Sequence, residues 1–184
     1  MLGNSLSPDP TFNNKKYELV WQDAPWQVYE NRAAVPRTFL TSDYVIVQDK
    51  NETIKTFFTK DFNESKTIIL NQDPHIEGGG VTIASARITD YKPNLVTIAA
   101  KTNRDSLLFL SDNYYPGWKA SIDNKETKIY LADYAFRAIL VPKGEHIIHF
   151  FYEPDSFKKG LLFSAVSLGI LGIIIVRFRR YEIT

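Results

Sequence analysis

The sequence contains no cysteine, which excludes disulfides, iron–sulfur clusters, thiol catalysis and cysteine-ligated zinc. Nine glycines and nine prolines among 184 residues are ordinary numbers, so collagen-like and low-complexity chains are excluded as well. The net charge of +1 predicts no strong field for a polyanion, and we expect no nucleic-acid partner. With 44% apolar residues, the chain has the composition and length of one folded domain plus a short appendage.

A long uncharged run is the strongest feature that the sequence does have. Residues 160–176 are 17 positions without a charge, flanked by Lys158 and Lys159 on one side and by Arg177 on the other. A helix of this length spans about 25 Å, close to the roughly 30 Å hydrocarbon core of a bilayer. We therefore predict a transmembrane helix over 157–177, with basic side chains that reach the interface. The alternative is a helix or strand buried in a soluble core, where basic residues at both ends are unusual.

Small residues recur along this predicted helix with a spacing of four. Ala165 with Gly169 forms one such pair, and Gly160 with Ser164 forms another. Small residues at this spacing let two helix backbones approach closely in lipid. We therefore expect membrane lipid and other transmembrane helices as partners of the span.

The N-terminal segment 1–16 lacks the basic and apolar regions of a signal peptide, and we expect it to be flexible. The basic residues beside the predicted span do not settle its orientation. Two lysines precede it and three arginines follow it, which is too small a difference for the positive-inside rule.

Residues 17–156 are predicted to form a mainly β domain. Short β-branched and aromatic runs at 17–21, 26–30 and 43–47 lie between turn signals. Tight hairpins are predicted at 123–124 and at 142–144, and the apolar residues of 147–152 predict a strand buried on both sides. Without βαβ alternation, this pattern indicates an antiparallel β-sandwich or jelly roll.

One short helix is predicted near 50–59. Asp49 with Glu52 resembles a capping box, and Ile54, Phe57 and Phe58 predict one apolar face.

Candidate chemistry in the sequence is sparse. His146 and His149 are three apart on a predicted strand, which puts them on opposite faces and makes them poor co-ligands for a metal. Residues 78–80 are three glycines, but neither a Lys-Ser/Thr pair nor a helix follows, so we interpret them as a flexible connection. No nucleophile elbow and no glycosidase-like pair of acids is recognisable. We therefore predict no catalytic, cofactor-binding or metal-binding residue.

Aromatic residues are the one suggestive surface feature. Tyr114, Tyr115 and Trp118 cluster around Pro116 and Gly117. Aromatic rings exposed on a β-sandwich can stack on sugar rings, so these three are candidate glycan or partner contacts. The alternative, which we favour for Trp118, is that the residues pack in the core around a Pro-Gly turn.

Four stretches together resemble one family. They are 29–37 (YENRAAVPR), 52–70 (ETIKTFFTKDFNESKTIIL), 114–123 (YYPGWKASID) and 131–164 (LADYAFRAILVPKGEHIIHFFYEPDSFKKGLLFS). In this order they resemble the C-terminal part of the YfhO family of bacterial membrane proteins, over about residues 17–176. One departure is Asn124, where the family usually has Gly after Asp. Because Asn also accepts a positive φ, we expect the hairpin to persist.

The resemblance implies a topology and a function. The YfhO family resembles the C-type glycosyltransferases, membrane enzymes that use polyprenyl-phosphate-linked sugars. In such proteins a bundle of membrane helices precedes a β domain that lies outside the cytoplasmic membrane, and a final span leaves a cytoplasmic tail, here 178–184. The catalytic acid is expected in an early loop of the bundle, and no position of this chain matches it.

The resemblance therefore implies an accessory domain plus the last span of a protein that transfers lipid-linked sugar to cell-envelope glycopolymers, non-catalytic on its own. A glycan or polyprenyl-linked sugar is then a candidate partner. The alternative is a stand-alone, membrane-anchored binding or structural module.

Overall fold

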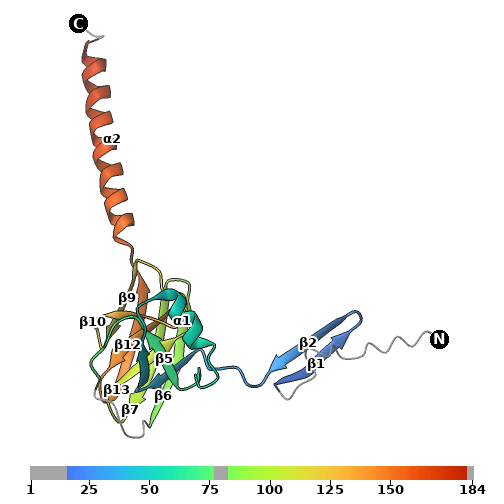
Figure 1. Ribbon diagram of the computed structural model, residues 1–184. Helices are drawn as coiled ribbons and strands as arrows, with labels where there is room; N and C mark the ends of the chain where they lie inside the picture. Colours follow the sequence, from blue (N-terminus) through green and yellow to red (C-terminus); the bar gives the residue numbers. More distant parts are fainter. Residues whose placement is uncertain (1–15, 77–82, 182–184) are drawn as a thin grey trace, which may run out of the picture. The chain divides into compact units, whose positions relative to one another are not determined.

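The computed structural model describes residues 16–76 and 83–181 (Figure 1). Its contacts divide the chain into two compact units, with the boundary between Pro36 and Arg37. The predicted flexible segment 1–16, apart from Lys16, and the predicted connection at 78–80 lie outside the described residues.

The first unit contains an antiparallel hairpin of β1 (Tyr17–Asp23) and β2 (Trp26–Asn31). The strands predicted at 17–21 and 26–30 are confirmed. Among the described residues they pair only with each other, in a two-stranded sheet, whereas the prediction counted them within one domain of 17–156. Their apolar side chains gave a strand signal, but periodicity does not say which strand is the partner.

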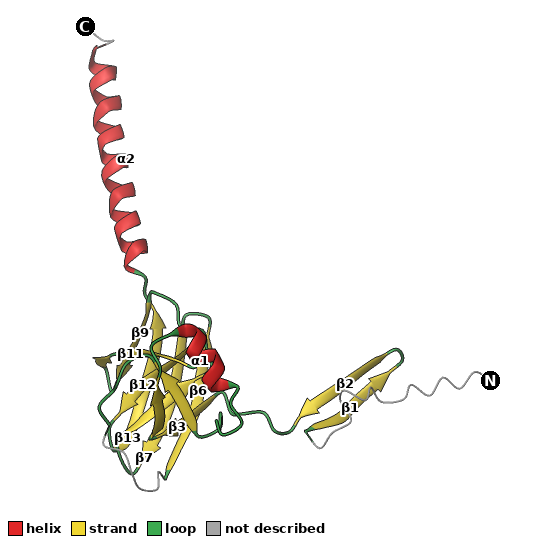
Figure 2. Ribbon diagram, in the orientation of Figure 1, coloured by secondary structure: helices red, strands yellow, loops and turns green. Residues whose placement is uncertain are grey.

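The second unit is built around two β-sheets, shown in Figure 2. One is an antiparallel five-stranded sheet in the order β10 (Lys125–Thr127), β9 (Trp118–Ile122), β13 (Gly144–Tyr152), β7 (Leu95–Thr102) and β6 (Ala84–Lys92). The other has six strands in the order β3 (Thr38–Thr41), β8 (Ser106–Leu110), β12 (Phe136–Val141), β11 (Ile129–Ala132), β5 (Thr67–Leu70) and β4 (Asp43–Ile46). The predicted β-sandwich is confirmed.

The main core lies between the two sheets. Ile98, Ile148 and Phe150 of the five-stranded sheet pack against Leu108 and Ile139 of the other, and all five are fully buried. The six-stranded sheet carries a second apolar cluster that includes residues of β5, β8 and β12. Every residue of β8 is buried, so this strand is enclosed on both faces.

Strand β13 is buried on one face only, so its prediction as a strand buried on both sides is wrong. Ile148 and Phe150 face the core, whereas Ile147 is 45% exposed. The five-stranded sheet has the core on one side and solvent on the other, and apolar residues on its outer face still produce a continuous apolar run in the sequence.

The six-stranded sheet contains a parallel pair that the sequence analysis did not foresee. Strands β4 and β5 run parallel, with helix α1 (Lys50–Phe57) in the crossover between them. The expectation of no βαβ unit is therefore wrong at this one place. Only Ser42 separates β3 from β4, although these are the two edge strands of the sheet. The sheet must therefore curl until its two edges meet.

Helix α1 begins as predicted but does not bury the predicted face. The Asp49 carboxylate accepts hydrogen bonds from the backbone N–H groups of Asn51 and Glu52, both at 2.9 Å. Ile54 and Phe58 are exposed, and the buried residue of the helix is Thr53. The cap is a local signal that the sequence contains, whereas the buried face depends on where the crossover lies on the sheet.

The two predicted hairpins have different outcomes. Asp123 and Asn124 have φ of 49° and 66° and join the paired strands β9 and β10, as predicted. The turn at 142–144 instead leads from β12 in one sheet to β13 in the other. Turn residues specify that the chain reverses, but the hydrogen-bonding partner is set by the packing of the sheets.

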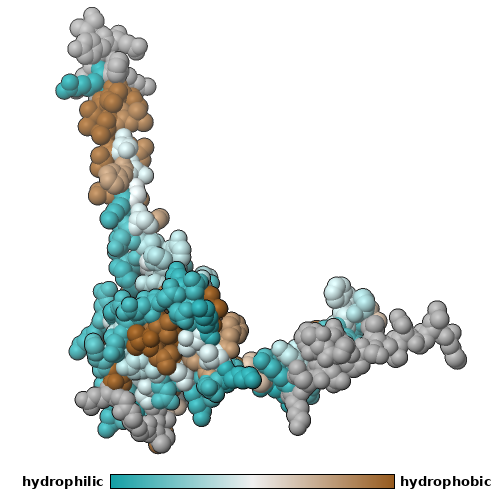
Figure 3. Space-filling view, viewed as in Figure 1, coloured by the Kyte–Doolittle hydropathy of each residue, from teal (hydrophilic) through white to brown (hydrophobic). Residues whose placement is uncertain are grey.

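Helix α2 (Asp155–Tyr181) follows β13. Its segment Asp155–Ile175 is 21 residues long with a mean hydropathy of 1.7, and none of it is buried (Figure 3). This agrees with the predicted span over 157–177, and the alternative of a buried core helix is wrong. Among the described residues outside the helix's own backbone, no atom lies within 4 Å of a Cβ built on Gly160, Gly169 or Gly172, so the helix surface is open at these glycines.

Asp133 occupies a strained and partly buried turn between β11 and β12. Its φ is 45°, its carboxylate accepts the Ile69 N–H at 2.7 Å, and its own N–H donates to the Ile69 carbonyl at 2.9 Å. Burial raises the pKa of the Asp133 carboxyl to about 6, although the Ile69 N–H opposes this shift. Between about pH 4 and 6, the folded state therefore holds a proton that the unfolded state releases.

The Asp133→Asn substitution should stabilise the chain at neutral pH, because Asn keeps the acceptor and tolerates a positive φ without burying a charge. We expect a gain of up to about 2–3 kcal/mol at pH 7, from a pKa difference of about two units. Since the wild-type carboxyl gains its proton in the folded state between about pH 6 and 4, the advantage should shrink over that range and vanish below it.

The measurement is denaturant unfolding of the detergent-solubilised chain, followed by circular dichroism from pH 4 to 7. The same substitution at the exposed Asp61 controls for the change in net charge. An advantage that is constant over the whole pH range would contradict the assignment.

Candidate functional site

The end of the sandwich from which α2 begins carries the aromatic cluster singled out in the sequence. Strand β13 ends at Tyr152, which lies opposite Trp118 at the start of β9. The Glu153 N–H donates to the Gly117 carbonyl at 2.7 Å. The Tyr-Tyr-Pro-Gly loop therefore lies directly beside the connection from β13 to α2.

A buried arginine is at the centre of this end. The side chain of Arg137, in β12, is 1% exposed, and its Nη2 is 2.9 Å from an Asp112 carboxylate oxygen. Its guanidinium carbon lies 4.0 Å from the centroid of the Trp118 ring and 5.3 Å from that of Phe150. Arg137 thus crosses from one sheet to the other, with its charge met by Asp112 and its flat surface by aromatic rings.

Asp112 also binds a second arginine at the surface. Nη2 of Arg37 lies 2.5 Å from the other carboxylate oxygen and donates to the Tyr91 hydroxyl at 2.8 Å. Hydrogen bonds to Asp112 and Tyr91 raise the pKa of Arg37. Burial lowers the pKa of Arg137, and the attraction of Asp112 opposes that shift, so the guanidinium stays charged. The Asp112 carboxylate therefore links Arg137 of β12 to Arg37, the residue directly before β3.

The predicted contact residues occupy two different environments. Trp118 begins β9 and is half-buried, with Arg137 over one face of the indole and Tyr152 at 5.5 Å between ring centroids. Tyr114 and Tyr115 are exposed. Gly117 has φ of 107°, and a Cβ there would lie 2.9 Å from the Tyr152 ring, so the turn requires glycine. A glycan or partner contact at these residues remains a prediction.

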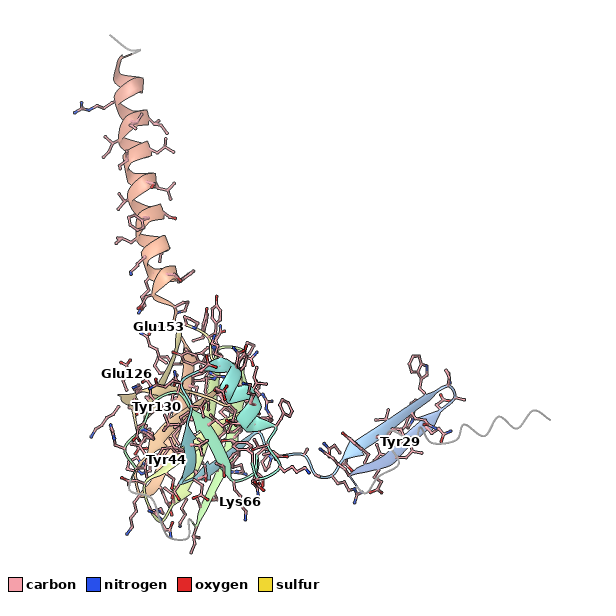
Figure 4. The ribbon with its side chains drawn as sticks, viewed as in Figure 1. Tyr29, Tyr44, Lys66, Glu126, Tyr130 and Glu153 are labelled. Atoms are coloured by element: carbon pink, nitrogen blue, oxygen red, sulfur yellow. The ribbon has the colours of Figure 1, made fainter. Side chains whose placement is uncertain are left out.

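Charged residues surround the connection to α2. The Glu153 carboxylate, labelled in Figure 4, lies 3.1 Å from Nζ of Lys119 and 2.5 Å from Nζ of Lys158. Hydrogen bonds from these two lysines lower the pKa of Glu153. A hollow of about 320 Å³ between the Pro116–Lys119 turn and the first residues of α2 completes this region.

A second polar site lies at the other end of β9 and β13. The His146 ring places Nδ1 2.7 Å from an Asp123 carboxylate oxygen, while the other oxygen accepts the Ile147 N–H at 2.9 Å. The hydrogen bond with His146 is the main cause that lowers the pKa of Asp123. The Nε2 atom of His146 is buried and has no hydrogen-bond partner among the described residues.

This histidine lines a groove of about 470 Å³ beside the β9–β10 hairpin. Glu126 and Tyr130, labelled in Figure 4, line the groove together with Lys125 and Lys128. We name it the Asp123–His146 groove. The sequence analysis missed it because its two central residues are 23 positions apart, although an Asp in a hairpin turn was a partial signal.

His146 and His149 do lie on opposite faces of β13, as predicted. His149 instead contacts the Thr97 hydroxyl, with 3.1 Å between Nδ1 and Oγ1. Across residues 16–76 and 83–181, no group of three or more His, Cys, Asp or Glu side chains is placed to hold a metal ion.

A β-sandwich joined through two residues to a long, exposed, apolar helix defines a class of β domains that carry a candidate membrane span. The comparison with known families agrees: residues 80–164, from before β6 to the first turns of α2, match the family described as bacterial membrane protein YfhO. The chain therefore carries a domain of the YfhO family, as its sequence motifs implied.

One relative is "Uncharacterized protein YfhO" of Bacillus subtilis (strain 168), 32% identical over 91 residues. The match covers 50% of this chain and 10% of that protein, so the chain spans only a small part of its relative. No solved structure matches the chain.

The two arginines that share Asp112 should contribute very differently to stability. Removing Arg137 leaves a hole between Trp118 and Asp112 and breaks a buried pair, so Arg137→Ala should cost about 3–5 kcal/mol. Arg37→Ala removes an exposed pair with the same carboxylate and should cost at most about 1 kcal/mol. Urea unfolding of the detergent-solubilised chain measures both. If both variants lose a similarly small free energy of unfolding, the contacts of Arg137 with Asp112 and Trp118 do not hold the sheets together.

Proposed function

We propose that residues 37–153 form an extracytoplasmic accessory domain of a YfhO-like membrane protein, anchored by α2, which takes part in lipid-linked sugar transfer to cell-envelope glycopolymers. The domain is non-catalytic on its own and positions an acceptor or a partner for the membrane part. The C-terminus of the chain lies in the cytoplasm.

The observation that carries this proposal is the direct connection between a YfhO-family β domain and an unburied apolar helix. Only Glu153 and Pro154 separate β13 from α2, and Glu153 is held by Gly117, Lys119 and Lys158. At about 1.5 Å per residue, the 21 residues Asp155–Ile175 reach roughly 31 Å, enough to cross the hydrocarbon core. The domain is thereby kept at one membrane surface.

Sugar transfer is supported by the resemblance of the family to C-type glycosyltransferases. In those enzymes the membrane bundle carries the catalytic acid, which leaves the β domain an accessory role. The open surface at Gly169 and Gly172, which are three residues apart on one face of α2, supports further helices as partners, since a second backbone fits such a surface better than lipid chains do.

The Asp123–His146 groove supports a second candidate, a stand-alone membrane-anchored binding module. The groove combines lysines, an acid and the Tyr130 ring around a histidine with an unused ring nitrogen. Such a mixture of hydrogen-bonding groups and an aromatic face suits a glycan. This candidate does not require a glycosyltransferase partner.

Orientation can be tested by cysteine labelling because the chain contains no cysteine. We expect a membrane-impermeant maleimide, applied to intact cells, to label Lys143→Cys in the exposed turn before β13. A cysteine added after Thr184 should be labelled only after permeabilisation. The protein is expressed in its natural gene context, and the unsubstituted protein gives the background. The reverse labelling pattern would refute the extracytoplasmic assignment.

The proposed role predicts a defect in the envelope. Deleting the gene should remove sugar substituents from one envelope glycopolymer while its backbone remains, as measured by composition analysis of purified polymers. The intact gene should restore the sugars, and a version without residues 37–153 should not, although it reaches the membrane in equal amount. If the sugars are unchanged by deletion and the purified full chain binds a glycan array, the binding-module function replaces this proposal.

A further inference from the structure

All exposed tyrosines among the described residues lie at the end of the sandwich from which α2 begins. They are 40–62% exposed and comprise Tyr91, Tyr114, Tyr115 and Tyr134. We propose that this tyrosine surface rests in the phospholipid headgroup layer of the membrane that α2 enters. The inference rests on α2 being the membrane anchor.

Hydrogen bonds and strand pairing bring the four tyrosines to one end. Tyr114 donates its backbone N–H to the Ala135 carbonyl at 2.6 Å, which places the Tyr114–Tyr115 loop beside the β11–β12 turn that carries Tyr134. Tyr91 is bound to Arg37, whose carboxylate partner Asp112 also holds Arg137 beneath Trp118. Three separate segments thus present tyrosines from the same end.

The connection to α2 keeps this end close to the bilayer. Two residues separate Tyr152 from the first residue of α2, and Phe157, the first large apolar side chain of the helix, is exposed. Five residues of fully extended chain from Tyr152 to Phe157 would span at most about 17 Å. The true distance is shorter, because the residues from Asp155 on are helical and rise only about 1.5 Å each. The hydrogen bond and ion pairs of Glu153 further restrict the connection.

The chemistry of tyrosine suits the headgroup layer. Its ring is apolar and its hydroxyl forms hydrogen bonds, so tyrosine is enriched where membrane and water meet. Lys158 and Lys159 lie in the first turns of α2, next to this end of the sandwich, and can pair with lipid phosphates. The opposite end of β13, at Lys143, carries no exposed tyrosine among the described residues.

A lipid-quenching experiment tests the proposal on the full chain in liposomes of phosphatidylethanolamine and phosphatidylglycerol. Tyr115→Cys carries an environment-sensitive fluorophore, and shallow nitroxide-labelled lipid is added. We expect a blue-shifted emission and a marked loss of fluorescence. The matched control is Lys143→Cys, also exposed but at the far end of the nine-residue β13, which should lose none. Equal quenching at the two sites would overturn the proposal.

A third site separates this inference from the proposed anchor. Phe163→Cys, in α2, should be quenched by nitroxides placed deep in the bilayer. If Phe163 is quenched and Tyr115 is not, the anchor holds and the tyrosine surface does not contact lipid. If Phe163 is not quenched either, both proposals fail. If the Tyr115 probe responds to added glycan and not to lipid, the surface binds glycan and this inference is wrong.

Discussion

Arg137 imposes the constraint on which the end of the sandwich beside α2 depends. A charged guanidinium that is 1% exposed must be neutralised, because an unpaired charge in a protein interior is too costly to keep. Asp112 meets this requirement, and the rings of Trp118 and Phe150 cover the flat guanidinium. The pair fixes the chain just after β8 and the start of β9, and so sets where the aromatic loop leaves the sheet.

The same arrangement determines how the helix departs. Because Trp118 is held by Arg137, the Gly117 carbonyl is positioned to accept the N–H of Glu153, and Glu153 then binds a lysine on each side of the connection. The buried Arg137 is thus connected to the start of α2 through Trp118, at the start of β9, and the turn at Gly117. A domain attached in this way transmits its orientation to the following helix more directly than one on a flexible linker.

The two ends of the sandwich differ in chemistry. The end beside α2 carries exposed tyrosines and balanced ion pairs, whereas the far end of β9 and β13 carries the Asp123–His146 groove. Sequence patterns identified the aromatic cluster because its members are neighbours in the chain. They could not identify the groove, because Asp123 and His146 meet only when β9 pairs with β13. The ion pair of Arg137 with Asp112 could not be identified either, because these residues are also far apart in the sequence.

The sequence by itself determined the local elements: the uncharged helix, the cap at Asp49, the turn at Asp123 and Asn124, and the YfhO-family motifs. Each depends on residues within a few positions of one another, so composition and spacing contain the signal. Only the tertiary structure decided that β1 and β2 form a two-stranded sheet of their own, that the turn at 142–144 joins two sheets, and that β13 is buried on one face. These features depend on burial and strand partners far along the chain, which local periodicity does not encode.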